Sequence, residues 1–252
     1  MRLLAESADA AARLHGLLEF TAMALGAALY RHARQRSGLP AMTAKGSFAL
    51  MVGLLVGAGL GNKLVFLVER PDYWLAFWQG GQPMRLGQSL VGGLLGGLIG
   101  IELAKALTRQ PASTGDLMVG PLAIGIALGR VGCFLAGLHD DTYGLPSTVP
   151  WALDLGDGLP RHPTALYEIA FVLTLAALLH RWRNRLALVP GLAFKGFLAG
   201  YLLWRLLIDG LKPVRVPYAL GLSGIQWVCL LALLCYLPFV ARAALRLRKT
   251  SR

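Results

Sequence analysis

Two arginines lie inside long apolar segments of the chain and are the first candidates for chemistry. Arg130 is flanked by Gly129 and Gly132, and Arg205 lies four residues before Asp209. An arginine at the centre of a bilayer costs at least about 2.5–3.5 kcal/mol on insertion scales, so it needs a partner, a water-filled cavity or a ligand. A guanidinium can hold a phosphate through two parallel hydrogen bonds, and glycines permit close approach. Arg205 and Asp209 share a helix face, so a self-neutralising pair is an equal alternative there.

A second group of candidates precedes and opens another apolar segment. His162 comes directly before Pro163, a residue suited to the first turn of a helix, and Tyr167 and Glu168 follow in the second turn. Tyr167 and Glu168 are expected to face different sides. Glu168 is a candidate acid, base or partner of one of the arginines, and a helix start with an interfacial Tyr is the alternative.

The third candidate is His139, which is followed by Asp140 and Asp141. Neighbouring carboxylates raise the basicity of a histidine, which suits a general base, although a solvated polar loop explains the same residues. Cys133 lies among apolar residues and is expected to be an inert thiol. No metal site is predicted, because no metal-binding spacing is formed by the cysteines Cys133, Cys229 and Cys235. Four further charges are expected to have structural roles by default: Lys63, Glu102, Asp116 and Lys195.

Composition predicts the elements that must position these residues. The chain has 252 residues, of which 56% are hydrophobic and 15% are charged, whereas soluble domains carry about 25% charged residues. Disorder is therefore excluded, and the long apolar segments argue against a soluble globule. We predict one all-α polytopic membrane domain over residues 1–252. Its seven transmembrane helices are expected at about 15–32, 47–68, 87–107, 116–137, 164–181, 191–211 and 223–242.

The distribution of basic residues predicts the orientation. The net charge is +12, and Lys and Arg favour one side of the predicted helices by roughly two to one. This bias places the N-terminus outside and the C-terminus in the cytoplasm, with residues 138–163 as a polar extracytoplasmic loop. The charge is thus explained by topology and anionic headgroups, and no nucleic-acid partner is predicted.

Two basic groups in an outward-facing, membrane-buried cavity indicate an anionic lipid headgroup as the ligand. The residues alone do not indicate a reaction. A non-enzymatic lipid-binding or transporter-like protein remains an alternative to an enzyme.

Several sequence blocks resemble the phosphatidylglycerol–prolipoprotein diacylglyceryl transferases of bacteria, from about the second to the seventh predicted helix. The Gly-rich segment and the Gly-Arg-Val-Gly-Cys-Phe block match the order of that family, as do the His-Pro-Thr-Ala-Leu-Tyr-Glu block and the Arg-containing sixth helix. These blocks lie at Trp78-Gln79-Gly80-Gly81, 92–97, Asp116, Pro121, 129–134, 161–168, 201–209 and Gly224-Ile225-Gln226.

The resemblance implies an enzyme of the bacterial inner membrane. Such enzymes move the diacylglyceryl group of phosphatidylglycerol to the thiol of a lipobox cysteine in a secreted preprotein, and glycerol phosphate leaves. Arg130 and Arg205 match the family's two essential arginines, and no metal or organic cofactor is implied. With the residue arguments above, this gives catalytic candidates Arg130, Arg205, His162, Glu168 and His139. The expected substrate-binding residues are Tyr167, Gly129, Gly132, Asp116, Asp209, Gln226 and Gly144.

The chain also departs from the family pattern. Two Asn and one Glu of the family signature, a His, a Gln and a Tyr are replaced here by Cys133, Ala136, Leu138, Val91, Ala165 and His15, respectively. Because the family His that precedes the Gly-Gly pair is absent, the general base and the acceptor are left open. His139 and His15 are candidate replacements for that base.

Overall fold

The computed structural model describes residues 4–5, 7–39, 43–80, 87–110, 113–140, 142–214 and 216–250. Nearly all regular structure in this part of the chain is helical. The chain forms two compact units, and each is described by itself. Unit 1 comprises Met1–Gly38, Ser113–Pro213 and Leu234–Arg252, and unit 2 comprises Leu39–Ala112 and Val214–Leu233.

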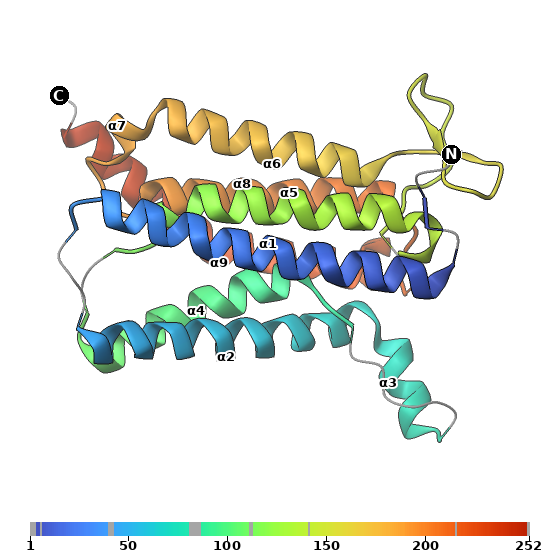
Figure 1. Cartoon of the computed structure of the whole chain (residues 1–252), viewed down its shortest axis with the longest axis horizontal. Helices are drawn as coiled ribbons and strands as arrows, with labels where there is room; N and C mark the ends of the chain where they lie inside the picture. The colour runs from blue at the N-terminus through green and yellow to red at the C-terminus, as the bar shows by residue number, and fades with distance from the viewer. Residues whose placement is uncertain are drawn as a thin grey trace. The chain divides into compact units, whose positions relative to one another are not determined.

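Unit 1 is a bundle in which α1 packs on α5, α5 on α6, and α6 on α8 (Figure 1). Its long helices are α1 (Ala8–Arg36), α5 (Val119–Ala136), α6 (Thr164–Arg181) and α8 (Leu192–Ile208). The short α7 (Arg183–Leu186), three 3-10 turns (Asp116–Met118, Gly137–His139 and Asp209–Leu211) and the end of α9 (Gly224–Thr250) complete it. The start of α1, the end of α5, the start of α6 and the end of α8 meet at one end of this bundle (Figure 1).

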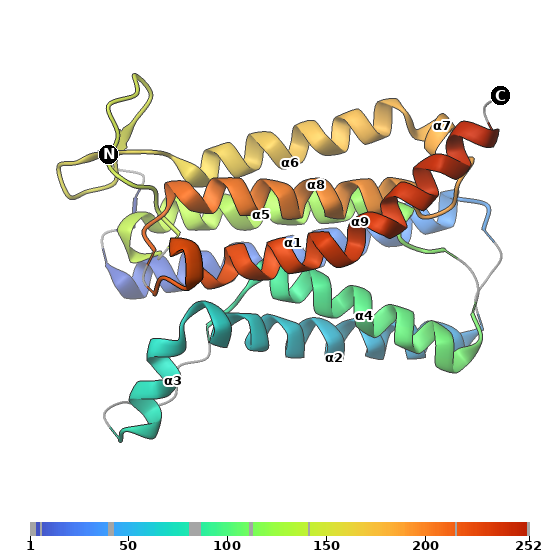
Figure 2. The ribbon, with the colours of Figure 1, turned by 180° about the vertical axis from the view of Figure 1, so that it is seen from behind.

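Unit 2 is built on α2 (Ala44–Glu69) and α4 (Leu90–Thr108), which lie side by side in both ribbon views (Figures 1 and 2). It also holds α3 (Pro71–Trp78), the 3-10 turn Ala219–Gly221 and the beginning of α9. Polar side chains tie α2 to the start of α4: Asn62 Oδ1 accepts a hydrogen bond from Ser89 N at 2.8 Å, and Lys63 Nζ donates to Gly87 O at 2.9 Å. Lys63 thus has the structural role expected for it.

Glycines allow α2 and α4 to approach backbone to backbone. A Cβ atom at Gly53, Gly57 or Gly61 of α2 would clash with a backbone carbonyl oxygen of α4. The opposing positions on α4 are Gly92, Gly96 and Gly100. Lipid tails are as apolar as Leu side chains, so membrane helices associate largely through such close packing of small residues.

Five described helical segments are long and apolar enough to cross a membrane: Ala44–Glu69, Leu90–Thr108, Asp116–His139, Thr164–Arg181 and Gly224–Thr250. The other two predicted spans, 15–32 and 191–211, also coincide with helices. However, α1 carries polar residues through its first half, and α8 has only 17 residues. The all-helical, multi-pass architecture is therefore confirmed, whereas the number of seven spans stays a prediction.

The segment predicted as a polar loop, 138–163, contains a small antiparallel sheet in its described part. Strand β1 (Leu153–Asp154) pairs with β2 (Pro160–Arg161), with Leu153 opposite Arg161. Arg161 forms an ion pair with Asp157 across this hairpin and donates to Gly144 O at 3.3 Å. The Asp157 carboxylate holds the pKa of Arg161 above its usual value.

Candidate active site

A buried carboxylate joins the two arginines singled out in the sequence. Glu168 of α6 is fully buried; its Oε1 atom lies 3.0 Å from Arg130 Nε of α5, and its Oε2 atom accepts a hydrogen bond from Arg205 Nη1 of α8 at 3.2 Å. The two guanidinium groups therefore flank a single carboxylate. Arg205 also forms the i,i+4 ion pair with Asp209 that the sequence offered as an alternative, whereas Arg130 pairs with Glu168 alone among the described residues.

Three further polar side chains extend this cluster. Tyr201 donates a hydrogen bond to Glu168 Oε1 at 2.6 Å, and Arg205 Nη2 donates to Asp209 Oδ1 at 3.1 Å. Lys212 Nζ lies 4.0 Å from both Glu168 Oε2 and Asp209 Oδ1. All three are buried. The ionic cluster, defined as Arg130, Glu168, Tyr201, Arg205, Asp209 and Lys212, holds three cationic and two acidic side chains, which leaves one positive charge in excess.

Lys212 is the member of the ionic cluster that lies beyond the end of α8. Burial and the nearby Arg205 cation lower the pKa of Lys212 to about 8, although the Glu168 carboxylate acts in the opposite direction. An ammonium with this pKa is mostly protonated at pH 7, so the excess positive charge persists under neutral conditions.

Local structure explains why Glu168 reaches the arginines. Pro163 precedes the first residue of α6, and Thr164 Oγ1 donates to Thr142 O at 2.9 Å, which fixes the start of that helix. Glu168 therefore lies in the second turn of α6, at the end of the bundle where α5 and α8 finish. Tyr167 faces away from the ionic cluster, as the spacing predicts.

His162 and Tyr167 form a separate polar group. Tyr167 Oη accepts a hydrogen bond from Trp151 Nε1 at 2.6 Å and lies 3.3 Å from His162 Nδ1. His162 also lines a small cavity together with Cys133 and Thr142. His162 is thus near Cys133, but no contact joins it to Arg130 or Glu168 among the described residues.

The remaining predicted site residues of unit 1 have packing roles or stand apart. A Cβ at Gly144 would clash with His162 O, whereas a Cβ at Gly132 would make ordinary contact with α1, and one at Gly129 would meet nothing. His139 is exposed in the 3-10 turn after α5. It makes no described contact with the ionic cluster, so we leave it out of the proposed site.

Two predicted substrate-binding residues form hydrogen bonds at helix starts. Asp116 accepts hydrogen bonds from Gly191 N at 2.6 Å and Phe194 N at 3.0 Å, at the opposite end of α8 from Arg205. Gln226 lies in unit 2, where its Oε1 accepts from Ser223 N at 2.9 Å and its own N donates to Ser223 Oγ at 3.2 Å. This reciprocal pattern is a capping box at the start of α9. Both residues are therefore omitted from the proposed site.

Sequence reasoning missed Tyr201 and Lys212 as members of the site. For Tyr201 the spacing offered a signal, because Tyr201, Arg205 and Asp209 recur every four residues and thus share one helix face. It also missed a cluster of His15, Cys133 and Asp140, whose donor atoms all lie within 4.8 Å of one another. Asp141 and Gly81, which the sequence also singled out, lie outside the described residues.

These observations define a class: a multi-pass helical membrane protein with an excess of buried positive charge at one end of a bundle. Comparison with known proteins narrows the class, because residues 3–242 match the model of the family described as "Prolipoprotein diacylglyceryl transferase". The chain belongs to the prolipoprotein diacylglyceryl transferase family.

Several relatives carry the name phosphatidylglycerol–prolipoprotein diacylglyceryl transferase. The relative from Bordetella parapertussis is 33% identical over 233 residues, which cover 85% of this chain and 84% of the relative. The relative from Nostoc sp. is 30% identical over 248 residues, covering 86% and 85%, respectively. The relative from Methylococcus capsulatus is 30% identical over 244 residues, covering 90% and 86%. The resemblance inferred from the sequence blocks is thereby confirmed.

The replaced motif residues have apolar or partly buried surroundings. Val91, in place of the family His, is 1% exposed in α4, and Ala136 is 3% exposed at the end of α5. Cys133 is half-buried and accepts a hydrogen bond from Arg130 Nη1 at 3.3 Å. Cys133 thus places a thiol beside Arg130, where the family signature has an Asn.

Proposed function

We propose that this protein transfers the diacylglyceryl group of phosphatidylglycerol to a cysteine thiol of a prolipoprotein, with release of glycerol phosphate. The observation that carries the proposal is the ionic cluster, in which Arg130, Arg205 and Lys212 share only two carboxylates. A phosphodiester carries one negative charge and would balance the one positive charge in excess. The family and the printed names of the relatives support the same donor and acceptor class.

Unused hydrogen-bond donors support an anionic ligand at this place. Among the described residues, Arg130 Nε and Arg205 Nε are buried donors without a hydrogen-bond acceptor. The Arg130 Nε atom forms an ion pair with Glu168 at 3.0 Å, but the contact lacks hydrogen-bond geometry. Buried donors are seldom left unsatisfied, and phosphate oxygens are strong acceptors.

The roles of the residues follow from the charge that develops during transfer. The thiolate attacks the glyceryl carbon bonded to the phosphate oxygen, and negative charge grows on the departing glycerol phosphate. Arg130, Arg205 and Lys212 are positioned to stabilise that charge in a site of low dielectric constant. Glu168 is assigned as a positioning residue, because both of its oxygens hold the arginines.

The proposed location is the bacterial inner membrane, with seven spans and the N-terminus outside. The bias of Lys and Arg supports this orientation. The acceptor would then be a secreted preprotein at the outer face, and the donor a lipid of the same bilayer.

Turnover by the purified protein tests this proposal. The protein is incubated with phosphatidylglycerol labelled in its headgroup and with a lipobox peptide, and release of glycerol phosphate is measured. We expect release by the natural protein, a loss of at least about 10²-fold in Arg130→Gln, and no change in Arg183→Gln, whose side chain is exposed. Equal activity of Arg130→Gln and the natural protein would refute the proposal. Binding of phosphatidylglycerol without release would favour the non-enzymatic alternative.

A further inference from the structure

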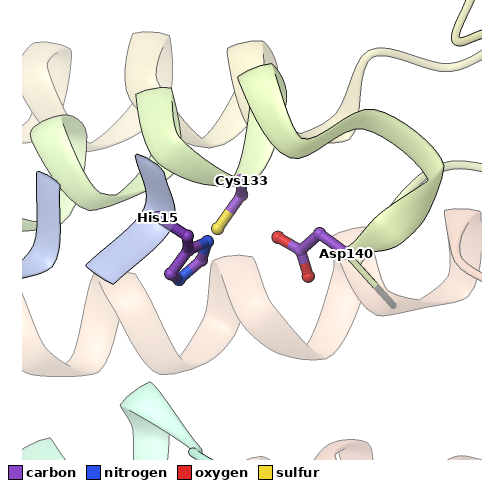
Figure 3. Close-up of side chains that lie close together, drawn as sticks. All are labelled: His15, Cys133 and Asp140. Carbon is purple, nitrogen blue, oxygen red and sulfur yellow. The ribbon is translucent and has the colours of Figure 1, made fainter. Parts of the chain in front are cut away.

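A second cluster lies beside Arg130 and takes no part in the ion pairs around Glu168. His15 of α1, Cys133 of α5 and Asp140, which follows the 3-10 turn after α5, each place one donor atom within 4.8 Å of the other two. Figure 3 shows the Cys133 sulfur next to a ring nitrogen of His15, with the Asp140 carboxylate pointing toward them. All three residues belong to unit 1.

We propose that His15, Cys133 and Asp140 bind Zn²⁺ and that the fourth coordination position takes the thiol of the acceptor. Cysteine sulfur, histidine nitrogen and aspartate oxygen are the ligand atoms that Zn²⁺ prefers. Catalytic zinc sites have three protein ligands and keep one position for water or substrate. The inference rests on the proposed function, because it assigns a means of activating the thiol in the same reaction.

The neighbours of this cluster support a metal site. His15 Nε2 lies 3.2 Å from Glu19 Oε1, and Asp140 accepts hydrogen bonds from Thr142 N and Thr142 Oγ1, both at 3.1 Å. A metal-binding His usually donates its other ring N–H to a carboxylate, and metal-binding carboxylates are themselves hydrogen-bonded. With Nε2 engaged by Glu19, Nδ1 of His15 is the nitrogen left for a metal.

The charges of the cluster also fit a dication. A Cys133 thiolate and the Asp140 carboxylate supply two negative charges, which match those of Zn²⁺. Arg130 Nη1 donates a hydrogen bond to Cys133 Sγ at 3.3 Å, so it can stabilise the thiolate. Arg130 also lies 3.0 Å from Glu168, which offsets part of its positive charge.

The chemistry gives the metal a clear part in the proposed transfer. Coordination to Zn²⁺ deprotonates a thiol at neutral pH. The bound thiolate then attacks the glyceryl carbon of phosphatidylglycerol; a C–S bond forms and the C–O bond to phosphate breaks. The electron pair of that bond stays on glycerol phosphate, which takes up the proton that the thiol lost. Because Arg130 contacts both Cys133 and Glu168, the phosphate and the bound thiol would be held side by side.

Direct attack by Cys133 is the competing use of the same sulfur. It would leave a thioether on Cys133, and a second thiol does not readily displace a thiolate from such a carbon. The product would block the site rather than pass the lipid to an acceptor. Cys133 therefore serves the proposed reaction better as a ligand than as a nucleophile.

Metal content and cobalt spectroscopy test the site without relying on activity. The full-length protein is purified, its zinc is measured, and Co²⁺ is then exchanged into it. We expect about one metal per chain and a thiolate-to-cobalt charge-transfer band that disappears in Cys133→Ser. The band should persist in Cys235→Ser, because that thiol is exposed on α9 and is not a member of the cluster.

Further variants separate loss of the metal from loss of the fold. Glu19→Gln retains all three ligands and should weaken Zn²⁺ binding by about 10–100-fold, while thermal unfolding of the metal-free protein stays unchanged. A metal-free natural protein that binds no Co²⁺, or a band that survives in Cys133→Ser, would overturn the proposal. A diacylglyceryl adduct on Cys133, detected by mass spectrometry, would also overturn it.

A peptide titration tests the open coordination position. A peptide with one cysteine should strengthen the charge-transfer band of the cobalt protein, because a second thiolate joins the metal, whereas the matched serine peptide should not. If glycerol phosphate is released but no metal binds, the zinc inference fails and the proposed function stands. If metal and thiol bind but no glycerol phosphate is released, the proposed function fails and the metal site stands without its assigned role.

Discussion

The two units of the chain hold their helices together by contrasting means. In unit 2, α2 and α4 are joined by facing glycines, with backbone against backbone. In unit 1, α5, α6 and α8 meet around Glu168, through side chains that a membrane interior accepts only at a cost. Packing through glycines depends only on the close fit of the two backbones, so we expect α2 and α4 to have a structural role. Buried charges that exceed their counter-charges have a use in holding a ligand, so the contrast supports the proposed site in unit 1.

Removal of the central carboxylate should show the largest effect. In Glu168→Gln, three buried cations face only Asp209, and we expect the free energy of unfolding to fall by about 3–5 kcal/mol because a buried charge loses its partner. Thermal and denaturant unfolding of the purified protein measure this. Glu102→Gln is the matched control from unit 2, since Glu102 is exposed and its surface pair with Lys105 contributes little. Similar losses of unfolding free energy in both variants would mean that the ionic cluster of unit 1 contributes no more to stability than a surface ion pair of unit 2.

Replacement of one arginine by lysine should separate charge from geometry. Arg205 uses Nη1 for Glu168 and Nη2 for Asp209, and a single ammonium cannot span the two carboxylates. We expect Arg205→Lys to lower the release of glycerol phosphate by about 10²-fold. Steady-state assays at saturating phosphatidylglycerol measure the change, with Arg183→Lys as the control. Full activity of Arg205→Lys would mean that charge alone suffices.

Two glycines of the same helix should respond differently to a side chain. A Cβ at Gly57 would clash with Gly96 O, whereas a Cβ at Gly59 would meet nothing within 4 Å. We expect Gly57→Val to lower the free energy of unfolding by about 1–3 kcal/mol through overpacking, and Gly59→Val to be nearly neutral. Thermal unfolding compares the pair. Equal losses would show that helix propensity, rather than the contact with α4, sets the cost.

The smallest expected effect is the pH dependence that Lys212 confers. Its pKa is lowered to about 8, so above that pH the ammonium becomes neutral and the grip on an anionic lipid weakens, by about tenfold. Binding of phosphatidylglycerol measured between pH 7 and 10 checks this. The stability of the protein should change in the opposite sense: between about pH 8 and the ordinary pKa of lysine the unfolded chain binds more protons, so the free energy of unfolding rises with pH.

Lys212→Arg is the control for this pH dependence. Arginine stays protonated throughout the range, so both changes should disappear in that variant. If the affinity of the natural protein is constant from pH 7 to 10, Lys212 takes no part in holding the lipid.

Part of the site could be predicted because charge in an apolar segment is conspicuous. Arg130, Arg205, Glu168 and Asp209 all lie within predicted spans, and the cost of burying them demanded partners. The sequence did not say that both arginines share Glu168, since that depends on how α5, α6 and α8 pack. Lys212 escaped notice because it follows the span and resembles an ordinary basic loop residue.

Other parts depend on tertiary packing that spacing does not reveal. His15 and Cys133 are distant in the chain and meet only because α1 packs on α5, where a Cβ at Gly132 would meet His15 Cα and Leu18. Asp116 and Gln226 match the order of the family blocks, yet their side chains cap helices. The spacing of the sequence does not reveal these hydrogen bonds, because they depend on where α8 and α9 begin. The helical architecture, by contrast, followed from composition alone.

The hydrogen bonds that Asp116 accepts at the start of α8 set the level of the two arginines along their helices. Asp116 binds the first turn of α8, and the same number of residues separates Asp116 from Arg130 as separates Gly191 from Arg205. Because α5 and α8 run parallel and Asp116 joins their starts, Arg130 and Arg205 lie at the same level along the two helices. An insertion of one residue in either helix would rotate its arginine by about 100° and shift it by about 1.5 Å, so the pair would fall out of phase.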